Sequence, residues 1–133
     1  MENNISVKPI YTTHDFELMG WHDCTIYAIH RPSLGETKLL LDIDYIFKWI
    51  NPVAPSPYYH FYISPATLVF EDVASLRMSI ETNTPLQINE LTKPKNDHKL
   101  WKIECQQGLI EFSATQFTQY NRRKPIETEE CSL

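Results

Sequence analysis

The longest apolar stripe in the chain is residues 39–49, Leu-Leu-Leu-Asp-Ile-Asp-Tyr-Ile-Phe-Lys-Trp. Its odd-numbered positions are all aliphatic or aromatic, whereas Asp42, Asp44 and Lys48 share the other parity. This two-residue period is typical of a β-strand that buries one face in a core. Because strands usually end within about 10 residues, we expect a bend or a bulge after Asp44.

The same period recurs in shorter segments on both sides of the stripe. The clearest local pattern is residues 101–114, where two alternating segments flank Gln106-Gln107-Gly108. A loop of three residues that ends in glycine predicts a hairpin with a type I turn and a glycine bulge. Gly35 predicts a hairpin loop over residues 32–36. The other strand predictions are a brief edge pairing at 16–19 and strands at 24–31, 58–64 (ended by Pro65), 67–71, 76–81 and 86–88.

The segments together predict about eight strands and at most one short helix, since no stretch keeps a 3.6-residue apolar period over ten residues. The fold class is therefore all-β and mainly antiparallel, either a β-sandwich or a strongly curved sheet that forms a partial barrel. We expect a single β domain over residues 16–124. A polar lead-in at 1–15 would precede it, and a flexible acidic tail at 125–133 would follow it.

Composition narrows the function classes. The chain has 133 residues, is 42% hydrophobic and carries a net charge of -5, which suits one compact domain and argues against a nucleic-acid-binding surface. The three cysteines are widely spaced and predict neither a disulfide framework nor a zinc site. No membrane span or signal peptide is predicted, so we expect a cytoplasmic protein. No cofactor or metal is expected, and the oligomeric state, a homodimer included, stays open.

Two pairs of polar residues are candidates for chemistry. His22 and Asp23 stand where a strand begins, and a neighbouring imidazole and carboxylate could act as a general base with its orienting partner or as metal ligands. Asp42 and Asp44 share one strand face and could converge on a cation with them. The alternative is structural, with turn and strand hydrogen bonds for the first pair and a solvated strand face for the second. Cys24 is expected to be a buried thiol rather than a nucleophile.

Aromatic residues flank a stiff loop at 51–57 that contains three prolines. Flat rings beside such a rim could line a groove for a sugar, a peptide or a partner protein. The alternative is that most of these rings form the core. The candidates for binding are Trp21, Trp49, Tyr58, His60 and Tyr62.

Four segments together resemble a family of small, uncharacterised, β-rich bacterial proteins. They are the Trp-His-Asp-Cys strand entry at 21–24, the run at 39–47, the block Ala-Thr-Leu-Val-Phe-Glu-Asp-Val at 66–73 and the closing Gly-Leu-Ile-Glu-Phe at 108–112. The layout is more distantly similar to immunity proteins of polymorphic-toxin systems. The resemblance spans residues 16–120. It implies a cytoplasmic protein that binds and blocks a toxin domain, and the net charge of -5 would suit a basic partner.

The leading hypothesis from the sequence is a non-enzymatic, immunity-like module that binds another protein. The first alternative is a hydrolase or metal-dependent enzyme that uses His22, Asp23, Asp42 and Asp44. The second alternative is a module that binds a sugar or another small ligand.

Overall fold

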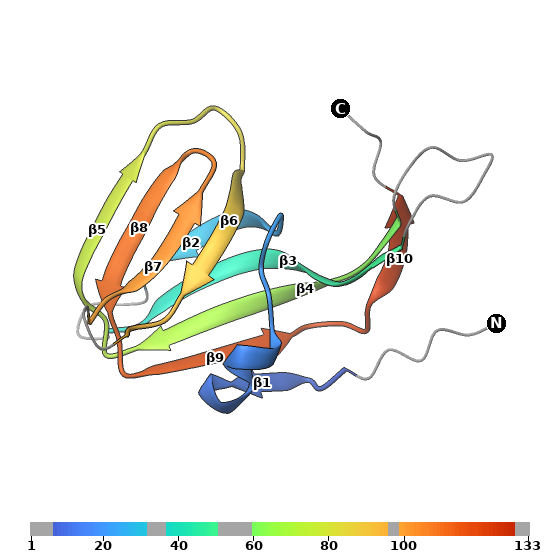
Figure 1. The fold of residues 1–133 in the computed structure, drawn as a ribbon, viewed down its shortest axis with the longest axis horizontal. Coiled ribbons are helices and arrows are strands. Elements are labelled where there is room, and N and C mark those ends of the chain that lie inside the picture. Colours follow the sequence, from blue (N-terminus) through green and yellow to red (C-terminus); the bar gives the residue numbers. More distant parts are fainter. Residues whose placement is uncertain (1–6, 32–36, 51–59, 96–98, 130–133) are drawn as a thin grey trace.

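The computed structural model describes residues 7–31, 37–50, 60–95 and 99–129, without the side chains of residues 49, 50, 128 and 129. The loops predicted at 32–36 and 51–57 lie outside the described residues. No helix among the described residues is long and apolar enough to cross a membrane. The elements, shown in Figure 1, are β1 (Ile10–Thr12), the 3-10 helix η1 (Thr13–Leu18), β2 (Thr25–His30), β3 (Leu39–Ile50), β4 (His60–Glu71), β5 (Ala74–Ile80), β6 (Leu86–Thr92), β7 (Trp101–Cys105), β8 (Gly108–Ser113), β9 (Gln116–Asn121) and β10 (Ile126–Glu129).

The strands form one sheet in the order β1-β9-β4-β3-β2-β6-β7-β8-β5. β9 pairs with residues 66–71 of β4, and β10 pairs with residues 60–63 of the same strand. All pairings between the described strands are antiparallel. The sheet curls round so that β5–β8 stand over β2–β4, but it does not close (Figure 1). This confirms the predicted all-β, antiparallel class in its curved-sheet form. The described part has more strands than the eight predicted.

The alternation of buried and half-buried residues along β3 shows which face of the strand meets the core. Leu39, Leu41 and Ile43 are fully buried, while Asp42 and Asp44 lie on the opposite face and are half-buried. The register of β3 against β4 shifts between Ile46 and Lys48, which confirms the irregularity expected after Asp44.

β4 runs through Pro65, where the sequence predicts a strand end. Pro65 pairs with Asp44 of β3, and its carbonyl accepts a hydrogen bond from the backbone N–H of Arg122, 2.8 Å away. The N–H and C=O of one strand residue point to the same side, so the donor that proline lacks would also point toward Arg122. Arg122 lies just after β9 and before β10. Proline is tolerated there because the neighbouring strand is interrupted at that point.

Aromatic side chains from distant segments fill the concave side of the sheet. Phe16 contacts Trp21 at a ring-centroid distance of 4.8 Å, and Phe70 contacts Phe112 at 4.7 Å. Phe117 lies among them, with its ring edge-on to Phe16 and to Trp21. These tilted and edge-on contacts are the arrangements that aromatic rings prefer, and they fix how the segment before β2 sits against β9.

The hairpin predicted at 101–114 is present, with a tighter turn than expected. Cys105 pairs with Gly108, so only Gln106 and Gln107 lie between β7 and β8. Gly108 has a φ of 155°, and a Cβ atom there would lie 2.0 Å from the carbonyl oxygen of Ser79 in β5. Glycine is therefore required by the close approach of β5 as well as by the turn.

Both ends of the described chain take part in the sheet. β1 pairs with β9, and β10 pairs with residues 60–63 of β4. The sheet thus extends beyond the range 16–124 that the sequence predicts for the domain. Residues 16–19 do not form the predicted edge strand, since residues 16–18 belong to η1.

Candidate functional site

Asp23 forms a β-bulge at the entry to β2. Its backbone N–H donates to the carbonyl of Ile88 (2.8 Å), while the N–H of Ile88 donates to the carbonyl of Cys24 (2.9 Å). Two residues of one strand thus oppose one residue of the other, and Asp23 adopts a φ of 69°. Aspartate tolerates this left-handed conformation better than most residues. The carboxylate of Asp23 accepts a hydrogen bond from Nε2 of Gln87 (3.1 Å), which holds the bulge against β6.

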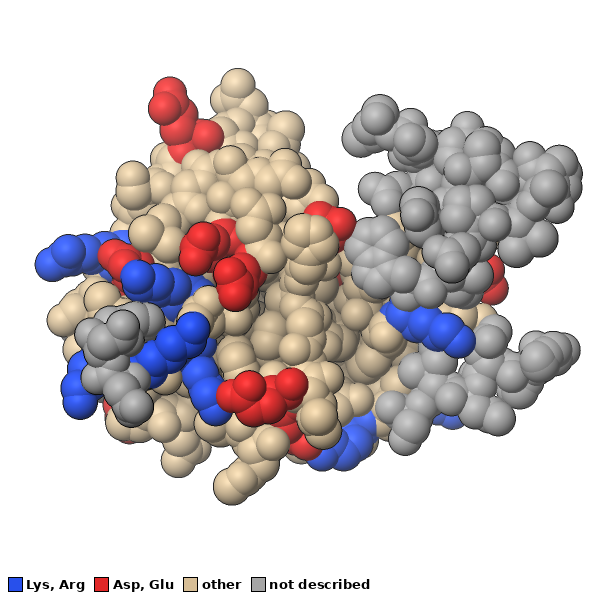
Figure 2. Space-filling model, viewed as in Figure 1, with Lys and Arg blue, Asp and Glu red and all other residues tan. Residues whose placement is uncertain are grey.

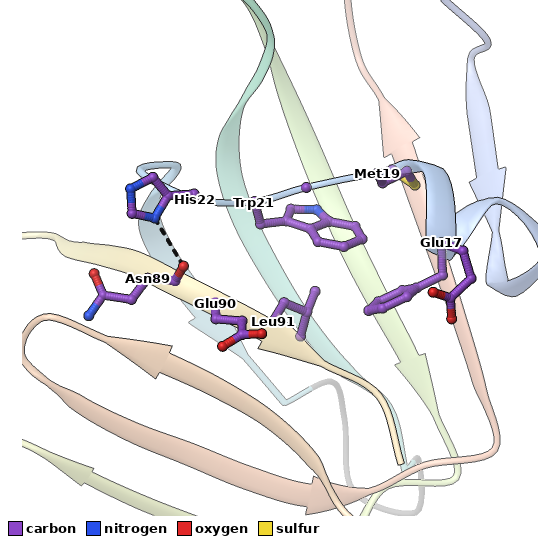
Figure 3. Close-up of a pocket in the computed structure, with 9 residues that line it drawn as sticks. Glu17, Met19, Trp21, His22, Asn89, Glu90 and Leu91 are labelled. Carbon is purple, nitrogen blue, oxygen red and sulfur yellow. Dashed lines mark hydrogen bonds between the residues drawn. The ribbon is translucent and has the colours of Figure 1, made fainter. Parts of the chain in front are cut away.

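His22 is exposed and points away from the core. Its Nδ1 lies 3.1 Å from the carbonyl oxygen of Asn89 (Figure 3). Because a carbonyl can only accept, Nδ1 carries the proton in this contact. Nε2 lies 3.5 Å from the carboxylate of Asp23. His22 is thereby tied to the start of β2 and to β6.

Asp42 joins three neighbouring segments on the outer face of the sheet. Its carboxylate accepts a hydrogen bond from Thr67 of β4 (2.8 Å) and lies 3.1 Å from Nε2 of His30 in β2. Arg122 lies 3.8 Å away. Burial acts to raise the pKa of Asp42, but the hydrogen bonds from Thr67 and His30 and the Arg122 guanidinium together lower it below its usual value.

Asp44 has a different partner, since its carboxylate accepts a hydrogen bond from the hydroxyl of Tyr27 at 2.6 Å. Within the described residues, no hydrogen bond or ion pair connects His22 or Asp23 with Asp42 or Asp44. Those residues also contain no group of three or more metal-ligating side chains arranged to hold an ion. The two candidate pairs therefore have separate partners.

Cys24 is fully buried. Burial raises the pKa of its thiol to about 12, so the thiolate is scarce at neutral pH.

The candidates for binding lie in different environments. Trp21 is only 3% exposed, and its indole N–H donates to the amide oxygen of Gln119. His60 lies 2.9 Å from the carboxylate of Glu127 in β10, and Tyr62 is half-buried on β4. The side chain of Trp49 and the whole of Tyr58 lie outside the described residues.

The 3-10 helix η1 precedes these candidates in the chain and is held in place by hydrogen bonds at its start. The hydroxyl oxygen of Thr12 accepts from the N–H of His14 (3.3 Å), and the carboxylate of Asp15 accepts from the N–H of Thr12 (2.8 Å). This reciprocal capping fixes the first turn of η1. The hydroxyl of Thr13 accepts a hydrogen bond from the N–H of Phe117 (3.2 Å), which attaches η1 to β9.

Leu18, the last residue of η1, is 90% exposed. Two depressions adjoin η1, and Met19 lines both. We call one of them the Glu17 depression, with a volume of about 270 Å³, and the other the Asp15 depression, with a volume of about 380 Å³. The Glu17 depression is lined by Phe16, Glu17, Met19, Gly20, Trp21, His22, Asn89, Glu90 and Leu91 (Figure 3). The Asp15 depression is lined by Lys8, Tyr11, Asp15, Leu18, Met19, Tyr45 and Phe47. We call Leu18 and both depressions the Leu18 surface.

A lysine contacts the lining of each depression. Lys93 lies 2.6 Å from the carboxylate of Glu17, and its ammonium stands 5.7 Å from the ring centre of Phe16. Lys8 lies 2.6 Å from the carboxylate of Asp15.

The fold and this surface define an all-β protein with one open, curved sheet and a short capped helix that presents an exposed leucine. Comparisons with protein-family models, with curated proteins and with solved structures found no match.

Sequence reasoning did not single out Leu18, Glu17 or Lys93. The one local indication was the spacing of Thr12 and Asp15, which is that of a capping box with aspartate in place of glutamate. It predicts a helix start, but neither the exposure of Leu18 nor its two neighbouring depressions.

Proposed function

We propose that the protein is a non-enzymatic, cytoplasmic module that binds another protein through the Leu18 surface. The observation that carries this proposal is the 90% exposure of Leu18 on a capped turn fastened to the sheet. A leucine buried on association contributes roughly 1.5–3 kcal/mol. The turn around it is already ordered, so less conformational entropy is lost on binding.

The surroundings of Leu18 fit a protein partner better than a small ligand. The depressions are partly open and have mixed polar and apolar linings, with Met19 shared between them. Protein interfaces commonly combine a few apolar anchors with a polar rim. An exposed leucine at the edge of the Asp15 depression, close to the Glu17 depression, suits a partner that covers all three.

The partner that best matches the charge of the chain is basic. The net charge of -5 favours association with a positively charged domain and would make the association rate fall with salt. An immunity-like role, in which the protein covers the working surface of a basic toxin domain, agrees with both the charge and the resemblance of the sequence.

The test compares two aspartate substitutions at exposed apolar residues. Leu18→Asp places a charge at the centre of the Leu18 surface. Met78→Asp changes a residue that is 48% exposed on β5, at the other end of the sheet from β1. Tagged proteins are used to capture partners from the native host at low and moderate salt, and thermal melting checks that both variants fold.

We expect wild-type protein and Met78→Asp to capture a stoichiometric, salt-sensitive partner. We expect folded Leu18→Asp to recover at least about tenfold less of that partner. Equal recovery by the two variants would place binding elsewhere. Failure to recover any partner at either salt concentration would count against a protein-binding role.

A further inference from the structure

Lysines of the chain itself make the same kind of contact at both depressions. The Lys93 ammonium lies against the carboxylate of Glu17 and over the ring of Phe16, two residues that line the Glu17 depression. In the Asp15 depression, the Lys8 ammonium lies against a carboxylate and 5.3 Å from the ring centre of Tyr11. A carboxylate beside an aromatic face attracts a cation through both charge and the ring quadrupole.

The two sites differ in what else their carboxylates hold. Asp15 also accepts the hydrogen bond from the backbone N–H of Thr12, so it is part of the helix cap. Glu17 has only Lys93 as a polar partner within the described residues, and its side chain is 71% exposed. Lys93 is itself 36% exposed. An ion pair this exposed is weak and exchanges readily, so the Glu17 carboxylate is available to another cation.

The remaining walls of the Glu17 depression suit the stem of a long basic side chain. Figure 3 shows Glu17 and Glu90 on two sides of the depression, with Trp21 and Leu91 between them. The aliphatic stem of a lysine or arginine packs well on such apolar groups while its charged end reaches a carboxylate. Figure 2 shows acidic and basic side chains next to one another on the viewed face, so close pairing of a carboxylate with a cation adds to the attraction that the net charge provides.

We infer that the Glu17 depression binds a lysine or arginine side chain of the partner protein, and that Lys93 makes the same contacts in the free protein. This inference rests on the proposed function of the Leu18 surface and names the group that the partner inserts beside Leu18. Arginine is common at the centres of interfaces because its flat guanidinium pairs with carboxylates and stacks on rings.

Lys93 is then an intramolecular competitor. A partner cation binds only to the fraction of molecules in which Lys93 has left Glu17 and Phe16, and the apparent affinity is reduced by that fraction. Replacing Lys93 with methionine keeps most of the apolar stem and removes the charge. The substitution should therefore tighten the binding of an external cation.

The test uses two probes, Nα-acetyl-lysine methylamide and its uncharged counterpart Nα-acetyl-norleucine methylamide. Each is titrated into the full chain while the NMR resonances of the Leu91 methyl groups and the Phe16 ring are followed. The variants are Lys93→Met, Glu17→Gln and the matched control Lys8→Met, which removes the lysine that pairs with Asp15.

The inference expects a saturable shift with the lysine probe and a weaker response to norleucine. It expects an apparent Kd about three- to sixfold lower in Lys93→Met, little change in Lys8→Met and a large loss of affinity in Glu17→Gln. Equal responses to both probes, an unchanged Kd in Lys93→Met or no saturable shift would overturn it. A negative result with the probes would not change the result of the capture experiment with Leu18→Asp. Failure to capture a partner would likewise not change a positive result with the lysine probe. The two experiments therefore distinguish failure of the lysine or arginine site from failure of the protein-binding role.

Discussion

The indole N–H of Trp21 donates a hydrogen bond to the amide oxygen of Gln119, 2.9 Å away in the core. Gln119 lies on β9 and is fully buried. Its amide nitrogen donates in turn to the side-chain oxygen of Asn121 at 3.0 Å. A buried glutamine is stable only when its polar atoms are paired. The pair therefore positions the segment before β2 against the far part of the sheet.

Truncating Trp21 should lower the stability of the fold. Trp21→Ala removes a buried ring that contacts Phe16, Tyr45 and Phe117, and it also leaves the amide oxygen of Gln119 without its donor. We expect the free energy of unfolding to fall by about 3–5 kcal/mol. Denaturant titration measures it, and a loss below about 1 kcal/mol would mean that Trp21 does not anchor the core.

The hydrogen bond itself can be isolated by a double-mutant cycle. Trp21→Phe keeps a ring but removes the donor, and Gln119→Leu removes the acceptor while keeping a similar volume. Each single variant leaves one buried polar group unpaired, at a cost of roughly 1–3 kcal/mol. The double variant removes both groups and should be more stable than the sum of the single losses predicts. Strict additivity in denaturant titrations would show that the two groups are not coupled.

Substitutions at two glycines form a matched pair that tests how closely β5 approaches β8. Gly108→Ala puts a Cβ atom within 2.0 Å of the Ser79 carbonyl oxygen, whereas a Cβ at Gly20 would have nothing within 4 Å. We expect Gly108→Ala to lower the free energy of unfolding by more than about 2 kcal/mol and Gly20→Ala to change it by less than about 1 kcal/mol. Thermal or denaturant melting of the two proteins decides the matter. Similar losses in both would refute the packing described for β8.

Stability should decline in alkaline solution because of the core thiols. Burial raises the pKa of Cys24 from 9.0 to about 12 and that of Cys105 to about 11. A group whose pKa is raised by folding supports the fold below its unfolded pKa, and this support is lost as pH rises toward the folded value. The decline should therefore begin near the unfolded thiol pKa of 9.0. For Cys24 alone it is on the order of 1 kcal/mol one pH unit higher.

Denaturant titrations on either side of the unfolded thiol pKa measure this decline. Cys24→Ala is the control, because it removes the largest of these shifts while leaving Cys105 in place. Its stability should fall less between the two pH values than that of the wild type. The same decline in both proteins would assign the pH dependence to other groups.

The strands could be predicted where one strand face is buried, because every second residue is then apolar. The alternation along β3, and that of Trp101, Ile103 and Cys105 in β7, depend only on local sequence and a two-residue period. The continuation of β4 through Pro65 was not predictable. It depends on the interruption between β9 and β10, which are far away in the sequence.

The Leu18 surface could not be predicted for a similar reason. A single leucine in a sequence carries no mark of exposure, and the contact between Lys93 and Glu17 depends on how β6 is placed beside η1. His22 and Asp23 were recognisable as a strand entry, but the bulge that Asp23 forms opposite Ile88 follows from pairing with β6. Residue chemistry was readable from the sequence, whereas the partners of each residue were set by tertiary structure.

Hydrogen exchange on the protein alone and in complex with the captured partner tests whether the Leu18 surface contacts that partner. We expect slower exchange of backbone amides at residues 16–22 and 89–91 in the complex, with β5 unchanged, because the Glu17 depression and Leu18 become covered. Protection confined to β5 or to the outer face around Asp42, with residues 16–22 unaffected, would contradict it.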